Sequence, residues 1–183
     1  MTIELSNLNF PDNAFREYLK QFDINGDNKL ASVERNVVKK INVNNKGITT
    51  LEGIEHFPKL EKLYCSKNNL TSLDVSKNTE LISLFCQKNQ LTELDVSKNA
   101  KLKRLECSQN SLASLDVRSN AALEYLWCSK NQLTSLNVES TNIDIINNPY
   151  SGFDAQNNTY PIAVESNRTF DLSTLPGFDV SKA

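Results

Sequence analysis

The chain has 183 residues, a formal net charge of −2 and a hydrophobic content of 39%, enough for one domain with a sizeable core or for an elongated array with a cap at each end. No Lys/Arg-rich block stands out, which argues against nucleic acid or an anionic membrane as partner. No run approaches the roughly 20 apolar residues of a membrane span, and Met1–Leu5 lacks the basic start and apolar stretch of a signal peptide.

Two helices are expected near the N-terminus. Residues 11–22 begin with Pro-Asp and place four large apolar side chains at helical spacing. A second helix is predicted over residues 33–41, with Val33, Val37 and Ile41 on one face. A helix pair of this kind would close the open end of whatever follows it.

The twelve residues 23–34, which join these helices, fit the loop of an EF-hand calcium site. Asn28 replaces the glycine that is usual at the sixth loop position, and Asn tolerates left-handed backbone better than other non-glycine residues. The donors at loop positions 1, 3, 5, 7 (through its carbonyl) and 12 are Asp23, Asn25, Asp27, Lys29 and Glu34. We expect one structural Ca²⁺ ion here; an Asx-rich turn that binds no metal is the alternative.

A repeat of 21 residues dominates the rest of the chain. Four copies follow one another without a gap, and each opens with L-x-x-L-x-C-x-x-N-x-L; they begin at Leu60, Leu81, Leu102 and Leu123. An imperfect earlier copy runs from Ile41 to Pro58. A single repeat cannot bury its own apolar residues, so the copies are expected to stack as a solenoid.

The spacing within a repeat predicts which side chains face the core. Leu63 and Cys65 are two residues apart, so both point inward from one strand while Tyr64 points outward. Leu73 and Val75 repeat this pattern half a coil later. Stacked coils should therefore form two parallel ladders on opposite walls, with neighbours about 4.8 Å apart.

Columns of polar residues recur at fixed offsets. The asparagines are expected to bond loop backbone groups that no sheet satisfies; they form the columns Asn68/Asn89/Asn110/Asn131 and Asn78/Asn99/Asn120. The cysteines occupy an inward slot where their side chains run parallel, which suits neither a disulfide nor a tetrahedral metal; they are Cys65, Cys86, Cys107 and Cys128. We expect free buried thiols rather than redox or metal chemistry.

The alternating L-x-x-L-x-C and L-T-x-L-D-V segments resemble the short, 21-residue class of bacterial leucine-rich repeats, as in internalin-like surface proteins. The resemblance covers roughly residues 10–183. It implies an α/β-type repeat solenoid with parallel β ladders: an EF-hand-like helical cap over residues 1–40, about five repeats over 41–143, and an irregular or β-rich cap over 144–183 that leads into a further module. It also implies a secreted or cell-surface location.

Function should reside in the outward columns, because packing fixes the inward ones. The outward strand positions carry aromatic residues beside charges, the composition of a binding hot spot; they include Lys62, Tyr64, Phe85, Arg104, Glu106, Tyr125 and Trp127. We expect a host or bacterial protein partner here, for recognition or adhesion. The alternatives are a structural spacer whose aromatic face packs on another domain or only on itself, and a glycan-binding module.

The opposite wall carries Asp74, Asp95, Asp116 and Asn137, which are expected to bond nearby backbone or Thr71 and Thr92 rather than to collect cations. Catalysis is not expected. His56 is the single histidine and has no evident nucleophile partner, and the chain has no Gly-rich phosphate loop.

Overall fold

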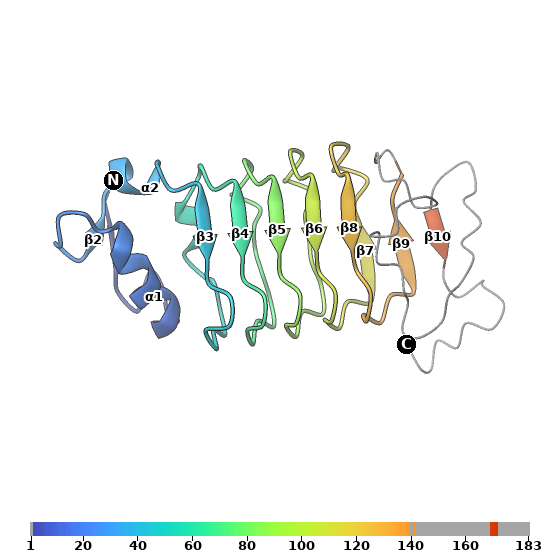
Figure 1. The fold of residues 1–183 in the computed structure, drawn as a ribbon, viewed down its shortest axis with the longest axis horizontal. Coiled ribbons are helices and arrows are strands. Elements are labelled where there is room, and N and C mark those ends of the chain that lie inside the picture. Colours follow the sequence, from blue (N-terminus) through green and yellow to red (C-terminus); the bar gives the residue numbers. More distant parts are fainter. Residues whose placement is uncertain (1, 140, 142–168, 172–183) are drawn as a thin grey trace.

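The main sheet of the solenoid contains one short strand from each coil (Figure 1). In the computed structural model, which describes residues 2–139, 141 and 169–171, the strands are β3 (Lys40–Asn42), β4 (Lys62–Tyr64), β5 (Ser83–Phe85), β6 (Arg104–Glu106) and β8 (Tyr125–Trp127). They are parallel and adjacent in that order. The middle residue of every strand is buried, as the two-residue periodicity predicts.

The second wall has strands only at the C-terminal end of the solenoid. β7 (Ser114–Asp116) pairs in parallel with β9 (Ser135–Asn137), and β10 (Thr169–Asp171) pairs antiparallel with β9. Leu73 and Val75 point inward as predicted, yet their coil has no strand there. The second ladder is thus shorter than predicted, and in the described residues it consists of β7, β9 and β10 alone. Apart from β10, the cap predicted over residues 144–183 lies outside the described residues.

The four cysteines form a buried column behind the main sheet. All four are free and buried, as predicted. Burial in the apolar core, with a smaller effect of the nearby Glu106 carboxylate, raises the pKa of Cys86 and Cys128 to about 12. Burial also raises the pKa values of Cys65 and Cys107 well above the ordinary range. The thiols therefore act as small apolar side chains.

The first asparagine column ties successive coils together. The amide nitrogen of Asn110 donates to the carbonyl oxygens of Cys86 (3.1 Å) and Cys107 (2.9 Å), and its oxygen accepts from the backbone N–H of Leu91 (3.1 Å). The same three bonds recur, one coil apart, for Asn89 and Asn131. This confirms the predicted structural role.

In the second asparagine column the amide nitrogen forms hydrogen bonds, but the amide oxygen does not. Nδ2 of Asn99 donates to the carbonyl oxygens of Val75 (3.0 Å) and Asn78 (2.9 Å). The Oδ1 atoms of Asn78, Asn99 and Asn120 are buried and accept no hydrogen bond. This column also links neighbouring coils, but it satisfies fewer backbone groups than the first one.

The N-terminal cap combines short helices with a two-stranded sheet. Its elements are β1 (Ile3–Glu4), α1 (Asn13–Leu19), the 3₁₀ helix η1 (Lys20–Phe22), β2 (Lys29–Leu30) and α2 (Ser32–Arg35). β1 pairs antiparallel with β2, and β2 lies within the predicted calcium loop. The first predicted helix is therefore present as α1 and η1.

The second predicted helix is much shorter than expected. It ends at Arg35, and the prediction that it reaches Ile41 is wrong. Val33 and Val37 are 76% and 68% exposed, whereas Ile41 is buried as the central residue of β3. Pairing of β3 with β4 therefore outweighs the helical periodicity, and β-branched side chains favour this outcome.

The cap docks on the first coil through an aromatic contact at a glycine. Phe10 is fully buried, and its ring lies edge-to-face with that of His56, 5.8 Å between centres. Gly53 has a φ of +99° and precedes the 3₁₀ helix η2 (Ile54–His56). A Cβ on Gly53 would overlap the Phe10 ring and lie 2.6 Å from the Asn9 carbonyl oxygen. This close approach permits only glycine.

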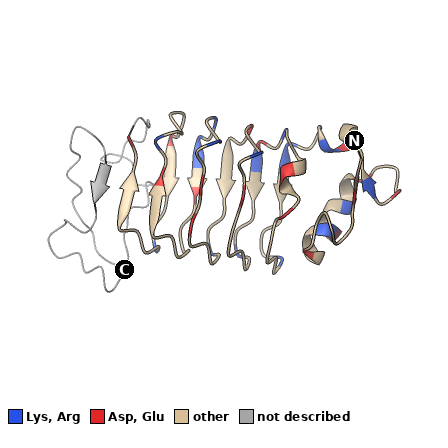
Figure 2. Cartoon of the chain, turned by 180° about the vertical axis from the view of Figure 1, so that it is seen from behind, with Lys and Arg blue, Asp and Glu red and all other residues tan. Residues whose placement is uncertain are grey.

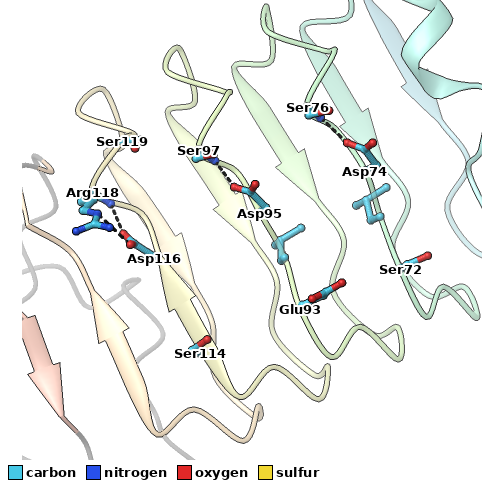
Figure 3. Close-up of a pocket in the computed structure, with 12 residues that line it drawn as sticks. Ser72, Asp74, Ser76, Glu93, Asp95, Ser97, Ser114, Asp116, Arg118 and Ser119 are labelled. Carbon is cyan, nitrogen blue, oxygen red and sulfur yellow. Dashed lines mark hydrogen bonds and ion pairs between the residues drawn. The ribbon is translucent and has the colours of Figure 1, made fainter.

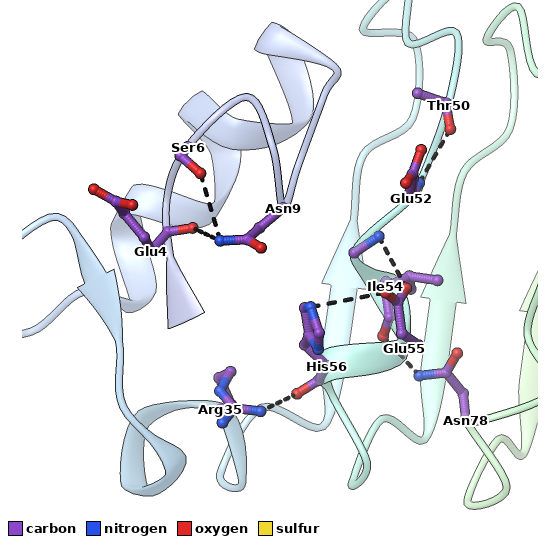
Figure 4. Close-up of polar contacts among 11 residues, drawn as sticks. Glu4, Ser6, Asn9, Arg35, Thr50, Glu52, Ile54, Glu55, His56 and Asn78 are labelled. Atoms are coloured by element: carbon purple, nitrogen blue, oxygen red, sulfur yellow. Dashed lines mark hydrogen bonds and ion pairs between the residues drawn. The ribbon is translucent and has the colours of Figure 1, made fainter. Parts of the chain in front are cut away.

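Polar contacts fasten the same junction. The guanidinium of Arg35, which is buried, donates to the carbonyl oxygen of Leu30. It also donates to the carbonyl oxygen of His56, as Figure 4 shows. Asp12 caps α1 and also accepts from the backbone N–H and hydroxyl of Thr49 in the first coil. Burial alone would raise the pKa of Asp12, but the hydrogen bonds from Thr49 and Phe15 outweigh it and hold that pKa below its ordinary value.

Candidate binding face

We define the strand face as the outward side chains at the first and third positions of the five main-sheet strands. The strand register aligns these positions in two columns. The first column is Lys40, Lys62, Ser83, Arg104 and Tyr125, and the second is Asn42, Tyr64, Phe85, Glu106 and Trp127. The seven residues predicted as ligand-binding therefore lie on one continuous face.

The aromatic residues of the strand face form two stacked pairs. The rings of Tyr64 and Phe85, on neighbouring strands, lie 5.0 Å apart at 15°. Those of Tyr125 and Trp127, on the same strand, lie 5.8 Å apart at 10°. All four side chains are partly exposed. Two rigid apolar ridges are thus presented to solvent.

Cations cover part of these rings. The ammonium of Lys40 lies 5.3 Å from the centre of the Tyr64 ring, and the guanidinium carbon of Arg104 lies 5.2 Å from that of Tyr125. Because β4 lies between β3 and β5, Lys40 and Phe85 approach the Tyr64 ring from opposite sides. Tyr64 therefore offers its edge rather than an open face. Sequence reasoning missed Lys40, which directly precedes the imperfect first repeat.

A polar interval separates the two ridges. Ser83 is buried, and Arg104 next to it is exposed. Glu106 lies between Phe85 and Trp127 in the strand register, and its Oε1 accepts from the backbone N–H of Ser108 at 3.2 Å. A partner on this face would meet one charge of each sign between the two aromatic ridges.

The opposite wall contains an acidic groove (Figure 3). The carboxylates of Asp74 and Asp95 accept from the backbone N–H groups of Ser76 and Ser97, both at 2.8 Å, and these bonds hold both pKa values below the ordinary range. The predicted backbone partners are confirmed, whereas the contacts described for these carboxylates involve neither Thr71 nor Thr92. Lining residues include Ser72, Asp74, Glu93, Asp95, Ser114 and Asp116.

The predicted calcium loop has its oxygen donors on one turn. Asp23 accepts from the backbone N–H groups of Gly26, Asp27 and Asn28. Asn28 has a φ of +60°, so it takes the left-handed conformation required at that position. Of the remaining donors, Asn25 and Asp27 contact each other at 3.1 Å, and the backbone N–H of Lys29 donates to Asp27.

Glu34, the last predicted calcium ligand, closes the loop. It is buried, and its carboxylate accepts from the backbone N–H groups of Ile24 (2.9 Å) and Ala31 (2.7 Å). Across the described part of the chain, no group of three or more His, Cys, Asp or Glu is placed to hold a metal ion. The donor types fit calcium, but in this arrangement the carboxylates are bonded to backbone N–H groups.

Comparison with known proteins identifies relatives of the repeats. The chain is 38% identical over 71 residues to internalin J of Listeria monocytogenes, a match that covers 38% of this chain and 8% of internalin J. The functional domain of that protein, described as including a cysteine ladder, has a TM-score of 0.71 and 36% identity, covering 76% of this chain and 31% of its own. No protein-family model matches.

A second solved internalin, InlF from the same species, shares the fold. Its TM-score is 0.58 at 19% identity, over 80% of this chain and 54% of that one. Among the described residues, no helix is long and apolar enough to cross a membrane. The sequence likeness to internalin J agrees with the structure, which has parallel coils and a column of cysteines. The chain is thus an internalin-like leucine-rich-repeat solenoid, homologous over part of its length to internalin J.

Proposed function

We propose that the solenoid is the protein-recognition module of a secreted or cell-surface bacterial protein, and that its partner binds on the strand face. The observation that carries this proposal is the pair of stacked aromatic ridges, exposed on a sheet whose inward side is fully packed. Large, rigid aromatic area next to an arginine is typical of binding hot spots. The likeness to internalin J supports the surface location.

Ring geometry favours a protein partner over a glycan. Sugar rings stack on open aromatic faces, but Tyr64 has Lys40 on one side and Phe85 on the other. Tyr125 has Arg104 and Trp127 beside its ring. Less open ring face of these two tyrosines is therefore left for a sugar, whereas ring edges suit the side chains of a folded partner.

The Trp127→Ala/Tyr64→Ala double variant is expected to lose its partners in pull-down from surface extracts. The melting temperature should change little, because both rings are partly exposed and lie on the outer surface of the sheet. The matched control is Thr71→Ala/Thr134→Ala, two exposed residues away from the strand face. A collapsed melting transition in the aromatic variant alone would show that the rings serve the solenoid itself. Unchanged capture would place binding elsewhere.

We further propose that one calcium ion stabilises the cap, held by Asp23, Asn25, Asp27, the carbonyl of Lys29 and Glu34. The left-handed Asn28 and the oxygen donors on one turn support this. Glu34 and Asp23 would exchange backbone N–H partners for the ion. Such a site would be structural, because the cap is fastened to the first coil by Arg35 and Asp12.

Calcium at about 10 mM is expected to raise the stability of the protein by about 2.7 kcal/mol if the site has an affinity of about 0.1 mM. Asp27→Asn should abolish this gain, since it removes a charged donor and keeps its shape. Asp95→Asn is the control, because Asp95 is also exposed and accepts from the N–H two residues on. Thermal melts with calcium and with chelator provide the measurement. Equal melting in both conditions would mean a metal-free turn.

A further inference from the structure

The two walls of the solenoid differ in their balance of charge; Figure 2 colours the charged residues along the chain. The strand face carries three cations, Lys40, Lys62 and Arg104, against a single carboxylate, Glu106. On the opposite wall, by contrast, the groove is lined by four carboxylates and one arginine, Asp74, Glu93, Asp95, Asp116 and Arg118. Lys77 and Lys98 lie beside Asp74 and Asp95 at its edge. The small net charge of the whole chain, −2, therefore conceals an excess of cations on the strand face and of carboxylates in the groove.

A column of lysines extends the positive wall. Backbone bonds continue the parallel pairing past the strands, as from the N–H of Lys67 to the carbonyl of Gln87 (2.9 Å). At this edge the residues take left-handed backbone, with φ between +55° and +59°, and they are exposed; they are Lys67, Lys88, Gln109 and Lys130. Three further cations thus lie three residues beyond Tyr64, Phe85 and Trp127 in their coils.

Within the part of the chain that the structure describes, these cations form no ion pair with a carboxylate. Lysines at the flanks are neutralised across coils, as in Lys39–Glu61 (2.8 Å) and Lys103–Glu124 (2.9 Å). In the described ranges none of the six cations on the strand face and its edge forms an ion pair; they are Lys40, Lys62, Lys67, Lys88, Arg104 and Lys130. Two of them, Lys40 and Arg104, lie over aromatic rings instead.

We infer that the strand face binds an acidic protein surface, one that presents carboxylates around apolar or aromatic anchors. This inference rests on the proposed function and specifies the chemistry of its partner. Unpaired cations around an apolar patch steer and orient a partner of opposite charge. The two aromatic ridges require apolar groups between those carboxylates, which a purely anionic polymer lacks.

Random copolymers can test this without the natural partner. Immobilised protein should bind poly(Glu,Tyr) more tightly than poly-Glu or heparin, and should not bind poly(Lys,Tyr). Lys67→Glu/Lys88→Glu should weaken poly(Glu,Tyr) binding about tenfold or more at low salt. Lys77→Glu/Lys98→Glu is the matched control: it lies in the same two coils and changes the net charge equally, but it is positioned beside Asp74 and Asp95.

Three outcomes would overturn the inference. Equal weakening in both lysine variants would mean that only net charge matters. Heparin binding as tight as that of poly(Glu,Tyr), and insensitive to Trp127→Ala/Tyr64→Ala, would indicate a polyanion site. Capture of surface partners that depends on the aromatic residues but not on Lys67 and Lys88 would retain the proposed function and reject an acidic partner.

Discussion

Replacing Gly53 by alanine is expected to destabilise the protein by about 3–5 kcal/mol. Two effects add. The residue has a φ of +99°, which costs an L-residue about 1–2 kcal/mol. The new methyl would also overlap the ring of Phe10, which is fully buried and cannot move outward without exposing the cap core. The measurement is chemical denaturation followed by circular dichroism.

Gly47→Ala separates the two effects. Gly47 also has positive φ, +68°, but nothing lies within 4 Å of the position of its added Cβ. This control should lose only about 1–2 kcal/mol, the backbone cost. If Gly53→Ala costs no more than Gly47→Ala, then Phe10 does not seat tightly on the first coil and the described cap junction is incorrect.

Asn110→Ala is expected to cost about 2–4 kcal/mol. It removes two hydrogen bonds to carbonyl oxygens and leaves the buried backbone N–H of Leu91 without an acceptor. The carbonyls are protected, because Cys86 keeps a bond from Asn89 and Cys107 one from Asn131. The orphaned donor therefore accounts for much of the loss.

Asn69→Ala provides the comparison for Asn110→Ala. Asn69 is exposed and its side chain makes one long bond, 3.4 Å, to Gly47. It should change stability by less than about 0.5 kcal/mol. Equal effects at the two positions would mean that the asparagine column does not hold the coils together. Urea denaturation of both variants under one set of conditions gives the two values.

Periodicity made the solenoid predictable from the residues alone. Leu63, Cys65 and Tyr64 recur at constant offsets, so the inward and outward directions of each coil follow from strand geometry. The outward aromatic column was predictable for the same reason. Both asparagine columns could be assigned because a recurring amide at a strand end has few roles other than bonding the backbone.

Contacts between the N-terminal cap and the repeats could not be predicted. Phe10 and Gly53 are more than forty positions apart in the chain, and no local pattern indicates that one seats on the other. Lys40 was not predicted because it precedes the imperfect first repeat, so its place beside Tyr64 follows only from the pairing of β3 with β4. The helix expected to reach Ile41 failed because strand pairing, a nonlocal interaction, competed for the same residues.

The cysteine column gives each of four coils its own internal chemical reporter. A thiol whose pKa is raised to about 12, as in Cys86 and Cys128, is about 1 part in 10⁵ thiolate at neutral pH and so resists alkylation while its coil is closed. Modification must then await local opening. Since each thiol lies in a different coil, the order in which peptides acquire label in a mass spectrum would record from which end the stack frays.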